Sequence, residues 1–137
     1  MFERFETMPG IGLKSNGKNK NEAILNLGNG FLALLSNTEE FPGEINMEME
    51  INISSEKNLA PDFLNSLLTE FQINKFLVTK INSVDIKDNK MKASLSGEKL
   101  KVNHKKNLNF ECKGASYNKA DIYEKNGRYY AECIIDI

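Results

Sequence analysis

Tryptophan, histidine, arginine and cysteine are scarce in this chain, and each scarcity argues against a class of site. The 137 residues include no Trp, one His, two Cys and two Arg. A single histidine leaves a zinc site short of nitrogen ligands, and Cys112 and Cys133 match no metal-ligand spacing. Paired hydrogen bonds to phosphate or guanine normally come from Arg, so specific nucleic-acid readout is disfavoured. The sequence therefore predicts no metal site and no cofactor.

Apolar stretches are short. The most apolar window, residues 23–35, is thirteen residues long and is interrupted by Asn26, Gly28, Asn29 and Gly30, so it cannot form a membrane-spanning helix. The start of the chain, MFERFETMPG, carries charges where a signal peptide needs an apolar core. We therefore expect a cytoplasmic protein, with secretion by a non-standard route left open.

The composition is that of an ordinary soluble domain, but the charge is unevenly distributed. Hydrophobic residues make up 40% of the chain and charged residues 27%, which together with the length predicts a single domain over residues 1–137. Residues 1–72 contain five basic and eleven acidic residues, a net charge of −6, whereas residues 73–137 contain thirteen and eight, a net charge of +5. This asymmetry bears on partners and encounter rates rather than on the fold.

Most of the chain has the alternation of β-strands. In residues 45–53, five apolar side chains alternate with polar ones, which include Glu48 and Glu50. We read these two carboxylates as the solvated half of a strand. Further strands are predicted over 75–81, 83–87, 90–96, 99–103, 108–113, 120–125 and 128–137, with a bulge at Asn82-Ser83 and hairpin turns at Asp88-Asn89 and Asn126-Gly127. Cys112 and Cys133 fall at alternating strand positions, which favours buried free thiols over a disulfide.

One amphipathic helix is predicted over about residues 60–72. Pro61 fits the first turn, Asp62 suits the positive end of the helix dipole, and an apolar stripe follows at helical spacing: Phe63, Leu64, Leu67, Leu68 and Phe71. Residues 23–35 are predicted as a central hairpin around Asn29-Gly30, and residues 10–21 as a mobile polar loop. The expected fold class is α+β, mainly antiparallel β, with a curved sheet or partly open barrel packed against one helix.

Two segments resemble catalytic or nucleotide-binding elements, but both are better explained as exposed loops. Gly12 to Asn19 falls one residue short of a phosphate-binding loop, because Asn19 replaces the hydroxyl that would hold magnesium. It also has a predicted hairpin after it, where a helix should follow. His104 lies in a hydrophilic turn with Lys105 and Lys106, which disfavour its charged form. We therefore predict no catalytic residues and expect that the protein is not an enzyme.

The C-terminal hairpin contains the most informative local pattern. A two-residue turn at Asn126-Gly127 places Tyr123 opposite Tyr130 on the outer face, where an aromatic pair either stabilises the hairpin or forms a contact surface. The core face then carries Tyr129, Ala131, Cys133, Ile135 and Ile137, and the outer face carries Tyr130, Glu132, Ile134 and Asp136. A lysine cluster is predicted on neighbouring strands and their turn: Lys99, Lys101, Lys105, Lys106 and Lys113.

These features favour a small non-enzymatic protein that acts through a protein partner, as an accessory protein, an inhibitor or an assembly subunit. The predicted binding residues are Tyr123, Tyr130, Lys101, Lys105 and Lys106. One alternative is a carrier of lipid or another apolar ligand, with a cavity lined by Met47, Met49 and the Leu-rich segment. A second alternative is single-stranded nucleic-acid binding by the lysines and tyrosines. If the hairpin is purely structural, the next candidate surface is the acidic half around Glu39, Glu40, Glu48 and Glu50.

Overall fold

The computed structural model describes residues 2–7, 10–36, 43–99 and 112–137. The described residues form seven strands, two α-helices and one short 3-10 helix. In chain order these are β1 (Phe2–Thr7), β2 (Gly10–Gly17), α1 (Lys20–Leu35), β3 (Ile45–Asn52), η2 (Glu56–Asn58), α2 (Leu59–Gln72), β4 (Phe76–Lys87), β5 (Lys90–Lys99), β6 (Gly114–Lys125) and β7 (Arg128–Asp136).

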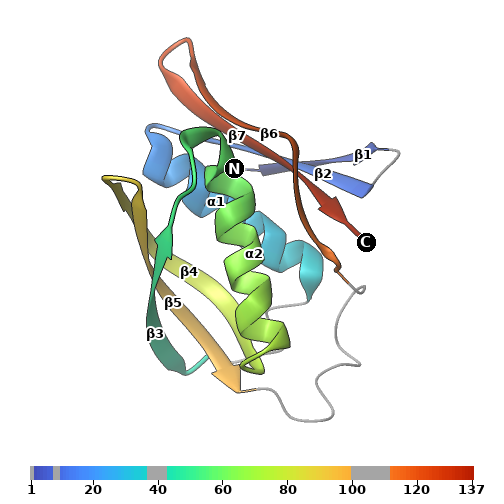
Figure 1. Ribbon diagram of the computed structural model, residues 1–137, viewed down its shortest axis with the longest axis vertical. Coiled ribbons are helices and arrows are strands. Elements are labelled where there is room, and N and C mark those ends of the chain that lie inside the picture. The colour runs from blue at the N-terminus through green and yellow to red at the C-terminus, as the bar shows by residue number, and fades with distance from the viewer. Residues whose placement is uncertain (1, 8–9, 37–42, 100–111) are drawn as a thin grey trace.

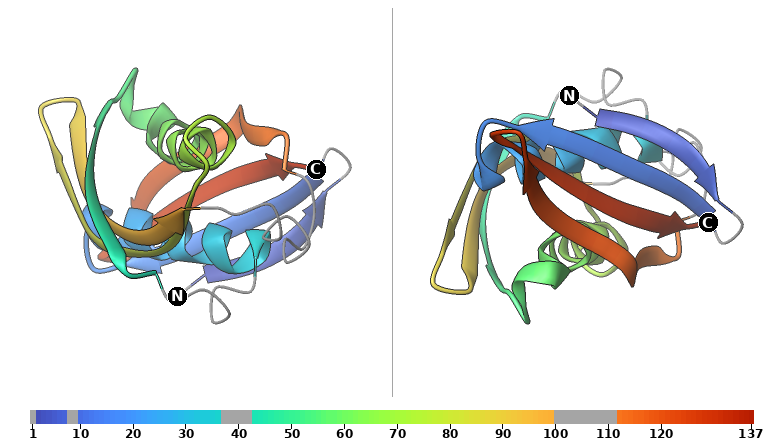
Figure 2. Two further views of the ribbon diagram at one scale, coloured as in Figure 1. Left: turned by 90° about the horizontal axis from the view of Figure 1, so that it is seen from below. Right: turned by 90° about the horizontal axis from the view of Figure 1, so that it is seen from above.

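The strands form two antiparallel sheets. The first sheet has the strand order β1-β2-β7-β6, and the second has the order β3-β5-β4. Figure 1 shows α1 and α2 lying between them, with the first sheet above and the second to the lower left. In the view from above in Figure 2, the strands of the first sheet lie in front of the helices, so its outer face points away from both.

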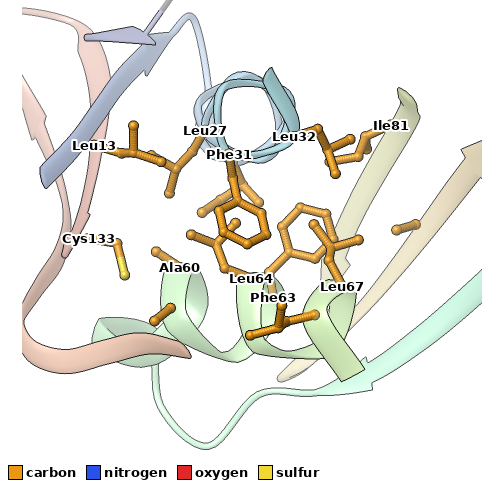
Figure 3. Close-up of a cluster of buried hydrophobic side chains, with 14 of the residues drawn as sticks. Leu13, Leu27, Phe31, Leu32, Ala60, Phe63, Leu64, Leu67, Ile81 and Cys133 are labelled. Carbon is orange, nitrogen blue, oxygen red and sulfur yellow. The ribbon is translucent and has the colours of Figure 1, made fainter. Parts of the chain in front are cut away.

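Apolar side chains of both helices fill the space between the sheets. Phe31 of α1 and Phe63 and Leu64 of α2 are buried almost completely, and Figure 3 shows them meeting between the two helices. Leu13 and Cys133 line one side of this core and Ile81 the other. Since burying one large apolar side chain contributes roughly 1.5–3 kcal/mol, this shared core holds the two sheets together through the helices.

The structure confirms the α+β, mainly antiparallel class and corrects the number of its parts. The expected arrangement had one curved sheet or partly open barrel and one helix, whereas the described residues form two separate sheets around two helices, and the sheets do not close into a barrel. The difference arises from α1, the helix that was not predicted, because it lies between the first sheet and the second. The expectation of a single domain over 1–137 is untested and stays a prediction.

Residues 23–35 form helix α1 rather than the predicted hairpin. Asn29 and Gly30, read as a turn, lie inside the helix. The helix begins at a cap in which the Asn19 side chain accepts a hydrogen bond from the Glu22 N–H at 2.8 Å. Gly28 faces Ile81 of β4, where a Cβ atom would come within 2.3 Å of the Ile81 Cδ1. The glycine therefore permits a close helix–sheet approach instead of a turn.

The segment 10–21, predicted as a loop, is strand β2 followed by the first residues of α1. Its pairing is extensive, since β2 lies between β1 and β7 and is hydrogen-bonded to both. Ile11, Leu13 and Ser15 are buried while Lys14 and Asn16 alternate with them on the outer face. The polar composition thus reflects one solvated face of a strand rather than a loop.

Several local predictions are confirmed. The mid-chain helix is α2, and Phe63, Leu64, Leu67 and Leu68 of its stripe are buried. The strand at 45–53 is β3, although burial is complete only toward its end, and Ile45 is 45% exposed. The two predicted turns have positive φ at their central residues, Asp88 and Asn89 in one and Asn126 and Gly127 in the other. The register of β4 shifts between Ile81 and Ser83, at the predicted bulge.

Three predicted strand divisions differ from the structure. The segments 75–81 and 83–87 are one continuous strand, β4, and β5 runs without a break from Lys90 to Lys99. Strand β6 begins at Gly114, earlier than the predicted residue 120. The predicted strands at 99–103 and 108–113 fall mostly outside the described residues. None of the helices formed by the described residues has the length and apolar character to span a membrane.

Candidate interaction surface on the outer face of the first sheet

Tyr123 and Tyr130 form the predicted cross-strand pair. The β6–β7 register places Tyr123 opposite Tyr130 and Lys125 opposite Arg128, as the Asn126-Gly127 turn requires. The two rings stack with their centroids 5.4 Å apart and their planes inclined by 15°. Both side chains are half-buried. Tyr130 alternates along β7 with the buried Ala131 and Cys133 of the core, so Tyr130 and its opposite residue Tyr123 lie on the outer face of the sheet. The pair therefore adds little to the core between the sheets.

Charged side chains from the neighbouring strands surround the tyrosines. Lys14 of β2 places its Nζ 5.4 Å from the centre of the Tyr130 ring, within the range of a cation–π contact. The same Nζ lies 3.4 Å from Glu132 Oε1, and the Tyr123 hydroxyl donates a hydrogen bond to that oxygen at 2.7 Å. Three strands thus contribute to one cluster, which we call the tyrosine face: Lys14, Tyr123, Tyr130 and Glu132.

The contacts of the tyrosine face raise the pKa of two of its groups, Lys14 and Tyr123. Hydrogen bonds with Tyr123 and with Glu132 raise the pKa of Lys14. Burial, followed by the hydrogen bond to Glu132, raises the pKa of the Tyr123 phenol. Both groups ordinarily titrate near pH 10, so the raised values keep an ammonium and a neutral phenol throughout the neutral range. Neither Lys14 nor Tyr123 is therefore a proton donor tuned to pH 7.

Two members of the tyrosine face were not among the predicted binding residues. Glu132 was expected on the outer face but without a binding role, and Lys14 was missed because it was expected in a loop. The signal was present in the alternation of buried Ile11, Leu13 and Ser15 with polar Lys14 and Asn16. Asn16 extends the same surface, since its Oδ1 accepts a hydrogen bond from Arg128 Nη2 at 2.7 Å. A strand assignment for β2 would have placed these residues beside the tyrosines.

The predicted lysine cluster is only partly described. Lys101, Lys105 and Lys106 lie outside the described residues, as does His104, so their predicted roles are untested. Lys99 ends β5 and Lys113 directly precedes β6. These two strands belong to different sheets, and the arrangement of the whole cluster stays a prediction.

The segment that resembles a phosphate-binding loop is followed by helix α1, contrary to the hairpin expected there. Phosphate binding is still disfavoured, for a different reason. The residues Gly10–Gly17 form a strand paired on both sides, so their N–H groups are used in the sheet. The Asn19 cap and Glu22 occupy the start of α1, where a phosphate would otherwise accept hydrogen bonds.

Both cysteines are buried free thiols, as predicted. Burial raises the pKa of Cys112, and it raises the pKa of Cys133 to about 12. A thiol with such a pKa is protonated near neutral pH and is a poor nucleophile. Among the described residues, no group of three or more His, Cys, Asp or Glu side chains is arranged to hold a metal ion.

The apolar-ligand alternative assumed a cavity lined by Met47, Met49 and the Leu-rich segment. That segment is α1, and its leucines pack into the core between the sheets. Met47 and Met49 are half-buried against the same core from β3. A groove of about 520 Å³ between α1, α2 and the β4–β5 turn is open and includes charged residues such as Lys20, Glu56 and Asp88. The described residues therefore give this alternative no structural support.

Comparison with known proteins gives a consistent family assignment. The model of the archease protein family matches residues 2–137. The chain is 26% identical over 137 residues to protein archease of Sulfurisphaera tokodaii, which covers 99% of this chain and 98% of that protein. It is 24% identical over 140 residues to protein archease of Methanosarcina mazei, which covers 99% of this chain and 95% of that protein.

Solved structures show the same fold. The solution structure of protein 1598 of Methanobacterium thermoautotrophicum matches with a TM-score of 0.79 at 20% identity, covering 99% of this chain and 98% of that one. The crystal structure of an archease from Thermotoga maritima, described as a possible chaperone, matches with a TM-score of 0.58 at 13% identity. This match covers 98% of this chain and 96% of that one. The family model spans nearly the whole sequence, and on that match the chain belongs to the archease protein family.

Proposed function

We propose that this chain is a non-enzymatic accessory protein that acts by binding a protein partner through the tyrosine face. The observation that carries the proposal is the stacked Tyr123–Tyr130 pair, with Lys14 and Glu132, on a sheet face that points away from both helices. Tyrosine is enriched at protein interfaces because it offers a large apolar ring and a hydroxyl that can hydrogen-bond. The description of the Thermotoga maritima relative as a possible chaperone supports the same class of function.

The tyrosine face suits a protein partner for two further reasons. Its charges are of both signs and close together, with Lys14 beside Glu132 at 3.4 Å, which provides specificity for a complementary surface. Its side chains are already held in place by mutual contacts, so little rotamer entropy is lost on binding. A cytoplasmic location, expected from the sequence, is part of this proposal.

Site-specific photocrosslinking in the source cell tests the proposal. A photoreactive amino acid replaces Tyr130 in one variant and Ile73 in the control. Ile73 is 72% exposed and follows α2, away from the tyrosine face. We expect one discrete protein to crosslink through position 130 and not through position 73. Crosslinking of the same protein with equal yield from both positions, or of none from position 130, would contradict the proposal.

A further inference from the structure

The two sheets have four edge strands, β1, β6, β3 and β4. Asparagine side chains of the helices hydrogen-bond to the outer backbone groups of two of them, β6 and β4. At β6, the Asn65 side chain of α2 donates to the Ala115 carbonyl at 3.0 Å and accepts from the Ala115 N–H at 2.8 Å. At β4, the Asn29 side chain of α1 makes the same pair of bonds with Ile81, at 3.2 and 3.0 Å. Each asparagine thus takes the hydrogen-bonding positions that another strand would use.

Strand β3 is the longer of the two remaining edges. It has eight residues, whereas β1 has six and carries charges of both signs, Glu3 and Arg4 among them. Within the described part of the chain, β3 is flanked by β5 on one side and by no strand on the other. Its residues are exposed at Asn46, Glu48 and Glu50 and half-buried at Met47 and Met49.

The direction of the β3 backbone groups follows from the Asn29 contact. Because the Ile81 N–H and C=O bond to Asn29, they point away from β5, so Ile81 and its opposite residue Leu95 form a non-hydrogen-bonded pair. Leu95 therefore bonds to its other opposite residue, Met47 of β3. Backbone groups alternate along a strand, so those of Asn46, Glu48 and Glu50 point outward from the sheet.

A second contact agrees with this assignment. The Ile53 N–H donates to the Asn89 carbonyl in the β4–β5 turn at 2.8 Å, so the odd-numbered positions are the ones directed toward β5. No hydrogen bond from any described residue reaches the outward backbone groups of Asn46, Glu48 or Glu50. The edge therefore offers a row of donors and acceptors in the geometry of a strand.

The negative charge of the β3 edge favours a basic binding partner. Residues 43–53 contain Glu44, Glu48 and Glu50 and no Lys or Arg. Glu50 forms an ion pair with the exposed Lys90, whose Nζ lies 3.5 Å from the Glu50 Oε1. A second copy of the chain pairing antiparallel through β3 would bring glutamates opposite each other in the central registers, and directly opposed like charges are destabilising. An extended segment with Lys or Arg on its outer face has the complementary charge.

We propose that the open edge of β3 binds an extended, basic segment of a partner protein as an additional strand. Main-chain hydrogen bonds to Asn46, Glu48 and Glu50 would hold the segment, and its basic side chains would lie beside Glu48 and Glu50. Apolar side chains alternating with them would cover the half-buried Met47 and Met49. This surface belongs to the second sheet and does not depend on the tyrosine face, so either proposal can fail without the other.

A synthetic peptide of alternating valine and lysine, seven residues long and capped at both ends, is the probe. It is titrated into the ¹⁵N-labelled full chain and followed by NMR, with a peptide of alternating valine and glutamate as its control. We expect the lysine peptide to shift the β3 amides and to slow hydrogen exchange at Asn46, Glu48 and Glu50. No change in these amides at millimolar peptide, or equal binding of the glutamate peptide, would overturn the proposal.

Two substitutions of Glu48 distinguish the contribution of the backbone hydrogen bonds to peptide binding from that of the side-chain charge. Glu48→Pro removes an outward N–H that the sheet does not use, and proline is tolerated at such edge positions. Glu48→Gln keeps the N–H and removes the charge. We expect Glu48→Pro to weaken lysine-peptide binding at least tenfold and Glu48→Gln only two- to threefold. Equal weakening by the two variants would show that strand addition is not the binding mode.

A charge exchange keeps the proposal testable if Glu48→Pro does not fold. The double variant Glu48→Lys/Glu50→Lys retains every backbone donor, and we expect it to bind the glutamate peptide in place of the lysine peptide. If it keeps the preference for lysine, Glu48 and Glu50 do not select the segment. Sedimentation of the wild type tests the alternative occupant, because a dimer that Glu48→Pro dissociates would replace the partner segment with a second copy.

Discussion

Asparagine side chains provide specific hydrogen bonds between the helices and the sheets. Asn29 and Asn65 each bond to both backbone groups of one strand residue, and Asn21 accepts from the Ile86 N–H at 3.2 Å. Asn26 donates to the Asn16 carbonyl at 2.9 Å. An amide carries both a donor and an acceptor, so one side chain can satisfy an N–H and a C=O on the same strand. These residues therefore fix how the helices sit on the sheets.

Asn65→Ala tests this role. The substitution leaves the Ala115 N–H and C=O without their partner in a partly buried position, and each unmade bond there is costly. We expect a loss of about 1–3 kcal/mol in the free energy of unfolding, measured by urea denaturation. The control is Asn74→Ala, which removes only an exposed contact with Glu70 and should change stability by less than about 0.5 kcal/mol. Equal effects would mean that closing the β6 edge is unimportant for stability.

The thiols give a second test at this scale. Since burial raises the pKa of Cys133 to about 12 and that of Cys112 above its usual value, both side chains stay protonated at pH 8 as long as the protein is folded. We expect iodoacetamide to modify neither cysteine in the native protein within an hour at pH 8, and both in 6 M guanidinium, as measured by intact mass. Rapid modification of the native protein would place at least one thiol at the surface.

Helix α1 shows why one element escaped sequence reasoning. Leucines fall on both faces of the segment 23–35, so alternation alone did not separate strand from helix, and Asn29-Gly30 matched a turn. Two helix signals were present: Asn19 followed three residues later by Glu22, and apolar residues at Ile24, Leu27, Phe31 and Leu34. Gly28 reflects contact with Ile81 and Phe63, a tertiary cause that no local pattern records.

A pair of reciprocal substitutions in α1 tests this account. Ala33 is exposed and Gly28 is buried. Ala33→Gly should cost about 0.5–1 kcal/mol because glycine is the poorer helix former. Gly28→Ala should also destabilise, by about 1–3 kcal/mol, because a Cβ there would lie 2.3 Å from Ile81 Cδ1 and 2.8 Å from Phe63 Cε2. Stabilisation by Gly28→Ala in thermal unfolding would contradict the close approach of α1 to β4.

On the scale of the whole molecule, strand pairing mixes the two halves of the charge distribution. The acidic β3 pairs with β5, so Glu50 lies opposite Lys92. In the first sheet, β2 pairs with β7, so Lys14 lies opposite Glu132. At these two places, strand pairing brings residues of the acidic half, with its net charge of −6, beside residues of the basic half, with its net charge of +5. We therefore base the proposed partner binding on local surfaces rather than on an overall dipole.

Local patterns predicted most elements, and long-range packing decided the rest. The β6–β7 hairpin, its register and the Tyr123–Tyr130 pair followed from one two-residue turn, because turn length fixes register. Two sheets instead of one, and the position of Lys14 beside Tyr130, depended on which distant strands pair, and strand alternation does not encode pairing partners. The predicted roles of Lys101, Lys105 and Lys106 stay predictions.

The central claim is that the tyrosine face binds a protein partner, and the dissociation rate of the Tyr130→Ala variant tests it most directly. The measurement uses the protein that crosslinks through position 130, immobilised, with wild type and Ile73→Ala as references. We expect at least tenfold faster dissociation for Tyr130→Ala, since an aromatic anchor that binding buries acts after encounter. The free energy of unfolding should fall by no more than about 1 kcal/mol, the range of a cross-strand pair. If a folded Tyr130→Ala variant dissociates at the wild-type rate, Tyr130 is not part of the surface that binds the partner.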